Sequence, residues 1–337
     1  MAEEFDAESI KRKIEQQREA TSAVEAEALA RRYELIRPFS GAATAYVRQV
    51  QDQDRFLLGL SGVDLKTRGH ARGELTFITG RATSGKTQVL LNAVHNNSNK
   101  HCLIFTPDET PEAVLAKLVA VRYGIMADVM EERVKVGDDE YLDIVHHAAS
   151  EDFSRLIVID SGLTLNQMGQ AFDEAEDYWS ERCDIVIYDF LELLPGDTSY
   201  NGVIAKAQAM KAWTREANVP MFCVRQNKRG EGDQRGKAQG IDGMAYGGEA
   251  EATIILEVFR KNQNRALPQW EREHTHKNTV TVNVAKNKRP PMKTGEVDLY
   301  MNPDTGHVRT ATREDLVRDG APTRDATEMA RAMKEQE

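Results

Sequence analysis

One short segment, residues 80–87, limits the possible folds of this chain more than any other feature. It reads GRATSGKT, which fits the pattern G-x-x-x-x-G-K-[ST]. It lies between an apolar run, ELTFIT at 74–79, and a segment predicted to be helical at 86–96. The two glycines let the backbone curl so that its N–H groups point inward, and the following helix adds its positive N-terminal end. A strand, this turn and a helix in that order predict a loop that holds the phosphates of a nucleotide.

Two side chains of this loop have specific predicted roles. Lys86 is expected to reach the β- and γ-phosphates, and the Thr87 hydroxyl is expected to ligate Mg²⁺. The residues predicted to bind the nucleotide are Gly80, Arg81, Ala82, Thr83, Ser84, Gly85, Lys86, Thr87 and Gln88.

Short apolar runs alternate with helical segments from about residue 72 onward. This alternation indicates βαβ units and an α/β fold with a mostly parallel central sheet flanked by helices. The predicted strands are 74–79, 101–105, 155–160, 184–189, 219–224 and 252–259, and the predicted helices are 86–96, 111–123, 164–180 and 203–217. Segments 279–287 and 295–303 alternate with a period of two, which predicts an antiparallel hairpin at the C-terminal edge of the sheet.

The rest of the chain suggests a simple domain organisation. Residues 1–36 are predicted to be helical with too few apolar side chains for a core, so 1–50 are expected to form an arm or linker. Residues 51–310 are expected to form one large α/β domain, and the charged residues 311–337 a mobile tail. The length of 337 residues is sufficient for such a domain with additions.

Composition excludes several classes of protein. No apolar run approaches the roughly 18 residues that a membrane helix needs, and the acidic N-terminus lacks the apolar centre of a signal peptide. We therefore expect a cytoplasmic protein without a membrane partner, in which the three separate cysteines are buried, reduced thiols. The net charge of −10 argues against a protein that coats nucleic acid, although it leaves room for a local basic channel.

Two strands end in an aspartate, and one of these is expected to complete a magnesium site with Thr87. Asp160 is followed by Ser-Gly and a helix start, so it is suited to shaping that turn. Asp189 is followed by further apolar residues, and a carboxylate buried in this way is costly unless it is paired with a cation. We therefore predict that Asp189 serves the metal, and that it meets the phosphate loop at the tips of adjacent strands.

Two stretches around Asp189 carry a family resemblance, IVIYDFLELLPGD and IAKAQAMKAWTREANVPMFCVRQNKRG. They resemble the ATPase domain of DnaB-type replicative helicases, a RecA-like group, and the resemblance covers about residues 55–310. It implies a RecA-like P-loop NTPase core that uses ATP and Mg²⁺. In that family an aspartate opening a D-[YF]-L-x-L segment serves the magnesium, and a glutamine at the next strand tip senses the γ-phosphate. Those positions are Asp189 and Gln226 here, which supports a structural role for Asp160.

The resemblance also implies the remaining catalytic residues. IFTPDETPEAVLAKL resembles the segment with the glutamate that activates water, and its position falls on Asp108 with Glu109 adjacent, so either residue is a candidate. VNVAKNKRPPMKTGEVDLYMNP resembles the hairpin whose lysine and arginine reach the γ-phosphate of a neighbouring subunit. Those positions hold Lys286 and Lys288, with Arg289 next, so the arginine finger is a lysine or is shifted by one residue.

A basic segment after Gln226 is the candidate nucleic-acid contact. Residues 225–237 read RQNKRGEGDQRGK and include three glycines, which predict a mobile loop able to contact a DNA backbone. Its basic residues are Arg225, Lys228, Arg229, Arg235 and Lys237. A second candidate is 195–203, for which an ordinary surface turn is an equally good interpretation.

Together these features predict an ATP-dependent DNA helicase or translocase. We expect a homo-oligomer, with a hexameric ring as the favoured form, that acts on single-stranded or forked DNA alongside replication or repair proteins. One alternative is a nuclease in which Asp108, Glu109, Asp189 and Glu192 hold divalent ions. Another is a RecA-like recombination ATPase that uses ATP as an assembly switch without unwinding.

Overall fold

The computed structural model describes residues 43, 46, 47, 50, 55–227, 236–240, 248–312 and 315. The chain divides into two compact units, Met1–Asp54 and Arg55–Glu337, and the second unit contains the predicted site. The predicted arm and tail lie almost entirely outside the described residues, so the domain bounds 1–50, 51–310 and 311–337 stay predictions.

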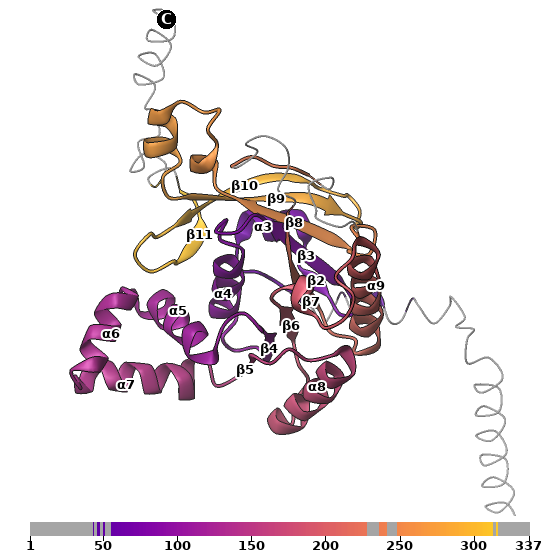
Figure 1. Cartoon of the computed structure of the whole chain (residues 1–337), viewed down its shortest axis with the longest axis horizontal. Coiled ribbons are helices and arrows are strands. Elements are labelled where there is room, and N and C mark those ends of the chain that lie inside the picture. Colours follow the sequence, from indigo (N-terminus) through magenta and orange to yellow (C-terminus); the bar gives the residue numbers. More distant parts are fainter. Residues whose placement is uncertain are drawn as a thin grey trace, which may run out of the picture. The chain divides into compact units, whose positions relative to one another are not determined.

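A nine-stranded sheet forms the centre of the second unit, in the order β11-β10-β9-β8-β3-β7-β6-β4-β5 (Figure 1). Strands β3 to β8 run parallel to one another, and β9, β10 and β11 continue the sheet antiparallel. These strands are β3 (Leu75–Gly80), β4 (Cys102–Phe105), β5 (Leu156–Ile159), β6 (Ile185–Tyr188), β7 (Met221–Gln226), β8 (Ile254–Phe259), β9 (Thr279–Asn287), β10 (Gly295–Met301) and β11 (Val308–Thr310). Strands β1 (Arg55–Phe56) and β2 (His70–Ala71) form a separate small pair.

Helices cover both faces of the sheet, because its strands are apolar on both sides. One buried cluster joins the sheet to α3, α4 and α5, and a second joins its other face to α8 and α9 (Figure 1). The α-helices are α3 (Ser61–Thr67), α4 (Lys86–Asn96), α5 (Pro111–Tyr123), α6 (Ala127–Lys135), α7 (Asp139–His147), α8 (Leu165–Trp179) and α9 (Tyr200–Glu216). Short helical turns occupy Ala148–Asp152 (η1), Leu191–Leu193 (η2), Lys261–Gln263 (η4) and Glu271–Thr275 (η5).

Local capping explains where several helices begin. The Thr110 hydroxyl accepts a hydrogen bond from the Ala113 N–H, and Pro111 occupies the first position of α5. Thr164 and Gln167 form a reciprocal capping box at the start of α8. The Ser199 hydroxyl accepts from the Gly202 N–H, so α9 begins at Tyr200, three residues before the predicted start.

The predicted fold class is confirmed, with additions that the sequence pattern did not indicate. From residue 74 onward each predicted strand and helix is present, and the predicted edge hairpin is β9 and β10. The helix predicted over residues 1–36 lies outside the described residues. Elements β1, β2, α3, α6 and α7 were not predicted, and β11 was not predicted as the true edge of the sheet.

The order of the strands corrects one geometric expectation. The phosphate loop and Asp189 were expected at the tips of adjacent strands, but β7 lies between β3 and β6. In the parallel register Gly80 lies opposite Gln226, so the tip of β7 separates the loop from the end of β6. Gln226 therefore occupies the centre of this edge of the sheet.

Candidate nucleotide-binding site

The turn after β3 has a backbone that requires its glycines. Gly80 has a φ of +154°, and a Cβ added there would lie 2.3 Å from the Val258 carbonyl oxygen. Gly85, directly before α4, has a φ of +97°. A side chain at position 80 would force the turn away from β8, so the sheet itself selects glycine there.

Lys86 lies folded into this turn. Its ammonium donates to the Gly80 carbonyl at 3.0 Å and to the Arg81 carbonyl at 2.8 Å. Burial lowers the pKa of Lys86, while the charges of Asp189 and Glu192 oppose that shift. The Ser84 hydroxyl is also buried and has no hydrogen-bond partner among the described residues. The loop therefore gathers a positive charge and unused donors at its inner side, as a phosphate site requires.

Thr87 and Asp189 meet at the mouth of this loop. The Thr87 hydroxyl donates to Asp189 Oδ2 at 2.7 Å. Burial raises the pKa of Asp189, and the hydrogen bond from Thr87 partly offsets this rise. Asp160, by contrast, is exposed and follows β5, the edge strand, with β7, β6 and β4 between it and β3. The geometry thus brings the predicted aspartate, and not its rival, to the loop.

The donor set at Thr87 and Asp189 fits magnesium. Both groups offer oxygen ligands, and Mg²⁺ is usually held by one or two protein oxygens together with phosphates and water. Within 55–227, 236–240 and 248–312, no group of three or more His, Cys, Asp or Glu side chains could hold a metal ion by itself. The four acids of the nuclease alternative are therefore not brought together as a two-metal site.

Asp108 and Glu109 are placed differently at the start of the turn before α5. Glu109 lines a small cavity together with Thr87 and Asp189, while Asp108 is outside that lining. One Glu109 oxygen pairs with Lys117, and the other is buried without a hydrogen-bond partner among the described residues. Of the two candidates, only Glu109 lines this cavity, and one of its oxygens has no hydrogen-bond partner among the described residues.

A larger cavity of about 340 Å³ opens beside the phosphate loop, a size typical of ligand sites. Its far wall consists of Arg260 and the turn between β10 and β11, residues 301–306. The Gln88 amide donates to the Gly306 carbonyl at 2.8 Å, and the Asn92 amide donates to the same oxygen at 2.9 Å. Gln88, which was predicted to bind the nucleotide, lines this cavity, and its side chain also holds the cavity wall through Gly306.

Both ends of the basic segment are attached to one buried acid. Gln226 is exposed at the tip of β7, and its neighbour Asn227 donates to Glu257 at 3.1 Å. After the segment, the Gln239 and Gly240 N–H groups donate to Glu257 at 2.7 Å and 3.0 Å. Glu257 is 1% exposed, and burial raises its pKa against these hydrogen bonds. The strand tip with Gln226 and the basic segment thus share one anchor on β8.

Arg225 was predicted to contact nucleic acid, and this prediction is wrong for the structure described. The side chain is 0% exposed within β7, with its guanidinium carbon 5.1 Å from the centre of the Phe77 ring. Its Nε lies 3.8 Å from Glu192 Oε1. Arg225 therefore serves as the internal counter-charge of Glu192, and Glu192 in turn lies close enough to Lys86 to influence its pKa.

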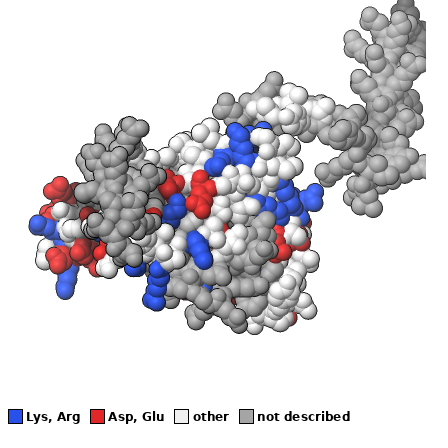
Figure 2. All heavy atoms as spheres, turned by 90° about the horizontal axis from the view of Figure 1, so that it is seen from above, with Lys and Arg blue, Asp and Glu red and all other residues white. Residues whose placement is uncertain are grey.

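The other nucleic-acid candidates are only partly described. Lys237 is exposed, whereas Lys228, Arg229 and Arg235 lie outside the described residues. In the second candidate segment, 195–203, Tyr200 onward belongs to α9. Figure 2 shows one face of the molecule, on which described basic and acidic side chains are interspersed.

The predicted trans-acting cations lie at the end of β9. Lys286 is half-buried and donates to the Glu249 carbonyl, while Lys288 is exposed and donates to the Ala250 carbonyl at 2.8 Å. Burial and the neighbouring charge of Lys288 lower the pKa of Lys286 to about 8.

Arg289, in contrast, is 8% exposed and directed inward. Its Nε donates to Glu74 at 2.9 Å, and one terminal nitrogen donates to the Thr67 carbonyl at 3.1 Å. Arg289 is thus a structural residue in this chain, and the prediction of a finger shifted by one position is wrong for the structure described.

Three functional neighbours were missed by sequence reasoning: Glu257, Asn92 and Arg260. An acid inside the apolar run IILEVF is the signal that could have singled out Glu257, because such an acid needs partners. The amide of Asn92 on α4 and the guanidinium of Arg260 after β8 carry no comparable signal, because their partners come from a turn distant in sequence.

Comparison with known proteins places this site in a family. Residues 57–308 match the family model described as DnaB-like helicase C terminal domain. The replicative DNA helicase DnaC of Bacillus subtilis is 20% identical over 247 residues, which are 70% of this chain and 52% of that protein. The replicative DNA helicase DnaB of Mycoplasma genitalium is 23% identical over 279 residues, 77% of this chain and 58% of that protein. The chain thus spans about half the length of these curated relatives.

Solved structures share the fold at low identity. One of them, an ATPase domain, superimposes with a TM-score of 0.70 and 18% identity, covering 82% of this chain and 99% of that one. A DnaB-like replicative helicase, studied for its interactions with primase, gives a TM-score of 0.68 and 19% identity over 91% of this chain and 76% of that one. The described part of the chain contains no helix with the length and apolarity needed to cross a bilayer.

Proposed function

Because this chain belongs to the DnaB-like helicase C-terminal domain family, we propose that it is the ATP-hydrolysing motor of a DNA helicase. The observation that carries the proposal is the hydrogen bond of 2.7 Å between Thr87 and Asp189 at the mouth of a glycine-dependent phosphate loop. A hydroxyl and a buried carboxylate in contact beside such a loop match the protein ligands of a magnesium–nucleotide complex.

Each residue of the site receives a role from its position. Lys86 exchanges its two carbonyl partners for phosphate oxygens when ATP binds. Mg²⁺, held by Thr87 and Asp189, would neutralise charge on the phosphates. Glu109 orients the attacking water through its free oxygen, which is the reason to prefer it over Asp108. Gln226, opposite Gly80, detects whether the terminal phosphate is present.

Hydrolysis takes place between subunits. Ile255 and Ile254 pair with Lys286 and Asn287, so the cations lie at the end of β8 remote from the phosphate loop. At about 3.3 Å per residue, this end is about 13 Å along the strands from the loop. Lys286 and Lys288 therefore serve the nucleotide of a neighbouring subunit, which favours a closed homo-oligomer such as a hexameric ring.

The DNA contact is proposed for the basic segment between Asn227 and Gln239, on single-stranded or forked DNA. Its anchor, Glu257, ties the segment to the strand tip that carries Gln226. A change in the position of Gln226 when ATP loses its terminal phosphate is thereby transmitted to the basic segment. That segment is suited to contacts with the phosphate backbone of DNA. Replication proteins are the proposed partner class.

The test compares two aspartates that differ only in their position. Asp189→Asn and Asp160→Asn are matched substitutions at the ends of parallel strands, and ATP hydrolysis is measured with and without single-stranded DNA. We expect Asp189→Asn to reduce the rate about 100-fold or more, because an electrostatic catalytic group is lost, and Asp160→Asn to hydrolyse ATP like the wild type. Wild-type hydrolysis is expected to rise when single-stranded DNA is added.

Two results would refute the proposal. Equal losses in the two variants would remove the special role of Asp189. A wild-type rate that does not respond to DNA, together with filament formation on DNA, would favour the assembly-switch alternative over a helicase.

A further inference from the structure

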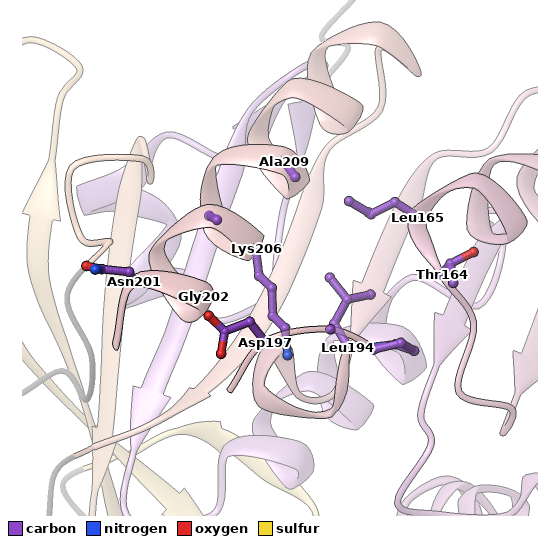
Figure 3. Close-up of a pocket in the computed structure, with 11 residues that line it drawn as sticks. Thr164, Leu165, Leu194, Asp197, Asn201, Gly202, Lys206 and Ala209 are labelled. Carbon is purple, nitrogen blue, oxygen red and sulfur yellow. The ribbon is translucent and has the colours of Figure 1, made fainter. Parts of the chain in front are cut away.

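A second cavity, of about 530 Å³, lies between the N-terminal ends of α8 and α9 (Figure 3). It is separate from the nucleotide cavity, with which it shares no lining residue. Its walls are largely apolar, and they are formed by Leu165, Leu194, Pro195, Ala205 and Ala209. Leu194 follows η2, so this wall continues the segment that begins at Asp189.

Lys206 of α9 projects its side chain along this cavity, toward Leu194 and Asp197 (Figure 3). The residue is 6% exposed, and its ammonium has no hydrogen-bond partner among the described residues. A buried ammonium without partners is unfavourable. Because the Lys206 side chain also lines this cavity, the cavity is suited to supply the missing partner in the form of a negatively charged group.

Asp197 is the acid of this cavity, and it is already engaged. One of its oxygens accepts from the Ser199 N–H at 2.8 Å, and the other accepts from the Ser199 hydroxyl at 2.6 Å. The hydrogen bonds from Ser199 lower the pKa of Asp197, and the charge of Lys206 contributes the smallest part of that lowering. No ion pair within 4.0 Å joins the two residues in the described structure, so the ammonium keeps its capacity for another partner.

These features select the chemistry of the ligand. The Lys206 ammonium is shielded from solvent. An anion in the cavity therefore contacts it after the flexible lysine stem rotates, and it contacts the tip of the side chain. A single ammonium neutralises one negative charge, which suits a monoanion better than a dianion, and a chain phosphodiester carries its charge between two bulky arms. We propose that this cavity binds a terminal carboxylate attached to a compact apolar body, with Lys206 as its counter-ion.

The experiment titrates the full-length protein with 4-fluorobenzoate and follows the fluorine NMR signal. We expect line broadening and a saturable shift with the wild type and none with 4-fluorobenzamide, the neutral analogue. Lys206→Met is expected to weaken binding about tenfold or more, because a charged hydrogen bond is lost. Lys206→Arg and Asp197→Asn are expected to retain it. A far-UV circular dichroism spectrum and melting curve establish that each variant is folded.

Further arms separate the sources of the carboxylate. A hexapeptide with an apolar C-terminal residue is used as the free acid and as the amide, and displacement of 4-fluorobenzoate by the acid alone identifies a protein C-terminus as the source. If the benzoate binds and neither peptide displaces it, the source is a small free acid.

Three outcomes would overturn the inference. In the first, the wild type does not bind benzoate. In the second, the wild type and Lys206→Met bind benzoate equally well. In the third, an oligodeoxynucleotide displaces the benzoate and acetate does not. A fourth outcome would also overturn it: the wild type does not bind benzoate, and Asp197→Asn and Lys206→Met lose equal amounts of stability. Lys206 would then only balance the charge of Asp197.

Discussion

Burial together with internal partners gives several charged side chains of this protein a structural role. Arg225 lies buried on the interior strand β7 beside Glu192, Arg289 is held by Glu74, and Glu257 is surrounded by amide donors. Each of these groups exchanges the solvation it would have in water for internal partners, and so becomes a part of the framework rather than a ligand contact. Residues of the same type in adjacent positions, such as Lys288 beside Arg289, divide between the two roles.

A buried histidine beside Arg289 makes this effect measurable. His70 is 1% exposed, with its Nδ1 2.9 Å from the Thr76 hydroxyl, and burial together with the charge of Arg289 lowers its pKa to about 3. The unfolded chain binds a proton near pH 6.5, whereas the folded chain does not, so the free energy of unfolding falls as pH is lowered from 6.5 toward 3. We expect a contribution of about 1.4 kcal/mol per pH unit from this residue.

Denaturant unfolding at several pH values checks this prediction. His70→Gln removes the titrating group, so its stability is expected to fall less steeply with acid than that of the wild type. His146→Gln, which changes an exposed histidine, is the matched control and is expected to keep the wild-type slope. Parallel curves for all three proteins would contradict the assignment.

The elements of the site form a connected series from β7 through the basic segment to β8. Asn227 lies near the start of the basic segment, Gln239 and Gly240 follow the segment, and all three donate to Glu257. The ends of the segment are thereby fixed relative to Gln226, although most of the segment itself lies outside the described residues.

Removing the charge of this anchor is expected to uncouple DNA from hydrolysis. In Glu257→Gln the carboxylate that accepts from Asn227, Gln239 and Gly240 becomes a neutral amide, so the free energy of unfolding is expected to drop by about 1–3 kcal/mol. The DNA-stimulated ATPase rate is expected to fall several-fold, with the DNA-free rate retained. Glu216→Gln, at an exposed position of α9, is the control, and a variant that keeps full stimulation would remove Glu257 from the coupling path.

At the scale of helices and strands, the sequence predicts most elements of the central sheet and its flanking helices but few of the elements added to them. Apolar runs separated by helices predict the parallel strands, because this pattern follows directly from burial on both faces. The three-residue β11 and the pair α6–α7 are too short or too weakly apolar to be recognised in this way. Strand order is a tertiary property, and for that reason β7 was not placed between β3 and β6. Likewise, nothing local distinguishes the buried Arg225 from the exposed Lys237.

At the scale of the whole molecule, the two sets of proposed catalytic groups lie at opposite ends of the central strands. The phosphate loop follows β3, while Lys286 and Lys288 lie beside the beginning of β8. In the proposed mechanism one copy therefore cannot apply both sets to one nucleotide, and we propose that head-to-tail contacts between copies complete the site.

Mixing two inactive variants tests this arrangement. Asp189→Asn lacks a working loop, and Lys288→Ala lacks an exposed trans cation. In a random 1:1 mixture about a quarter of the interfaces pair an intact loop with an intact lysine, so ATP hydrolysis is expected to recover when the subunits are mixed. Asp189→Asn mixed with Lys86→Ala is the control, because both lack the same half of the site. Activity no higher than the mean of the two parents would exclude sharing between subunits.

The contacts of Gln88 and Asn92 with Gly306 have a mechanical consequence. They fasten the hairpin turn of the outermost strands to the very helix that starts at the phosphates. Any tilt of α4 as its ligand binds or leaves must therefore move the turn between β10 and β11 as well. The edge of the sheet formed by β10 and β11 would then change position with the occupancy of the cavity, without any further intermediate element.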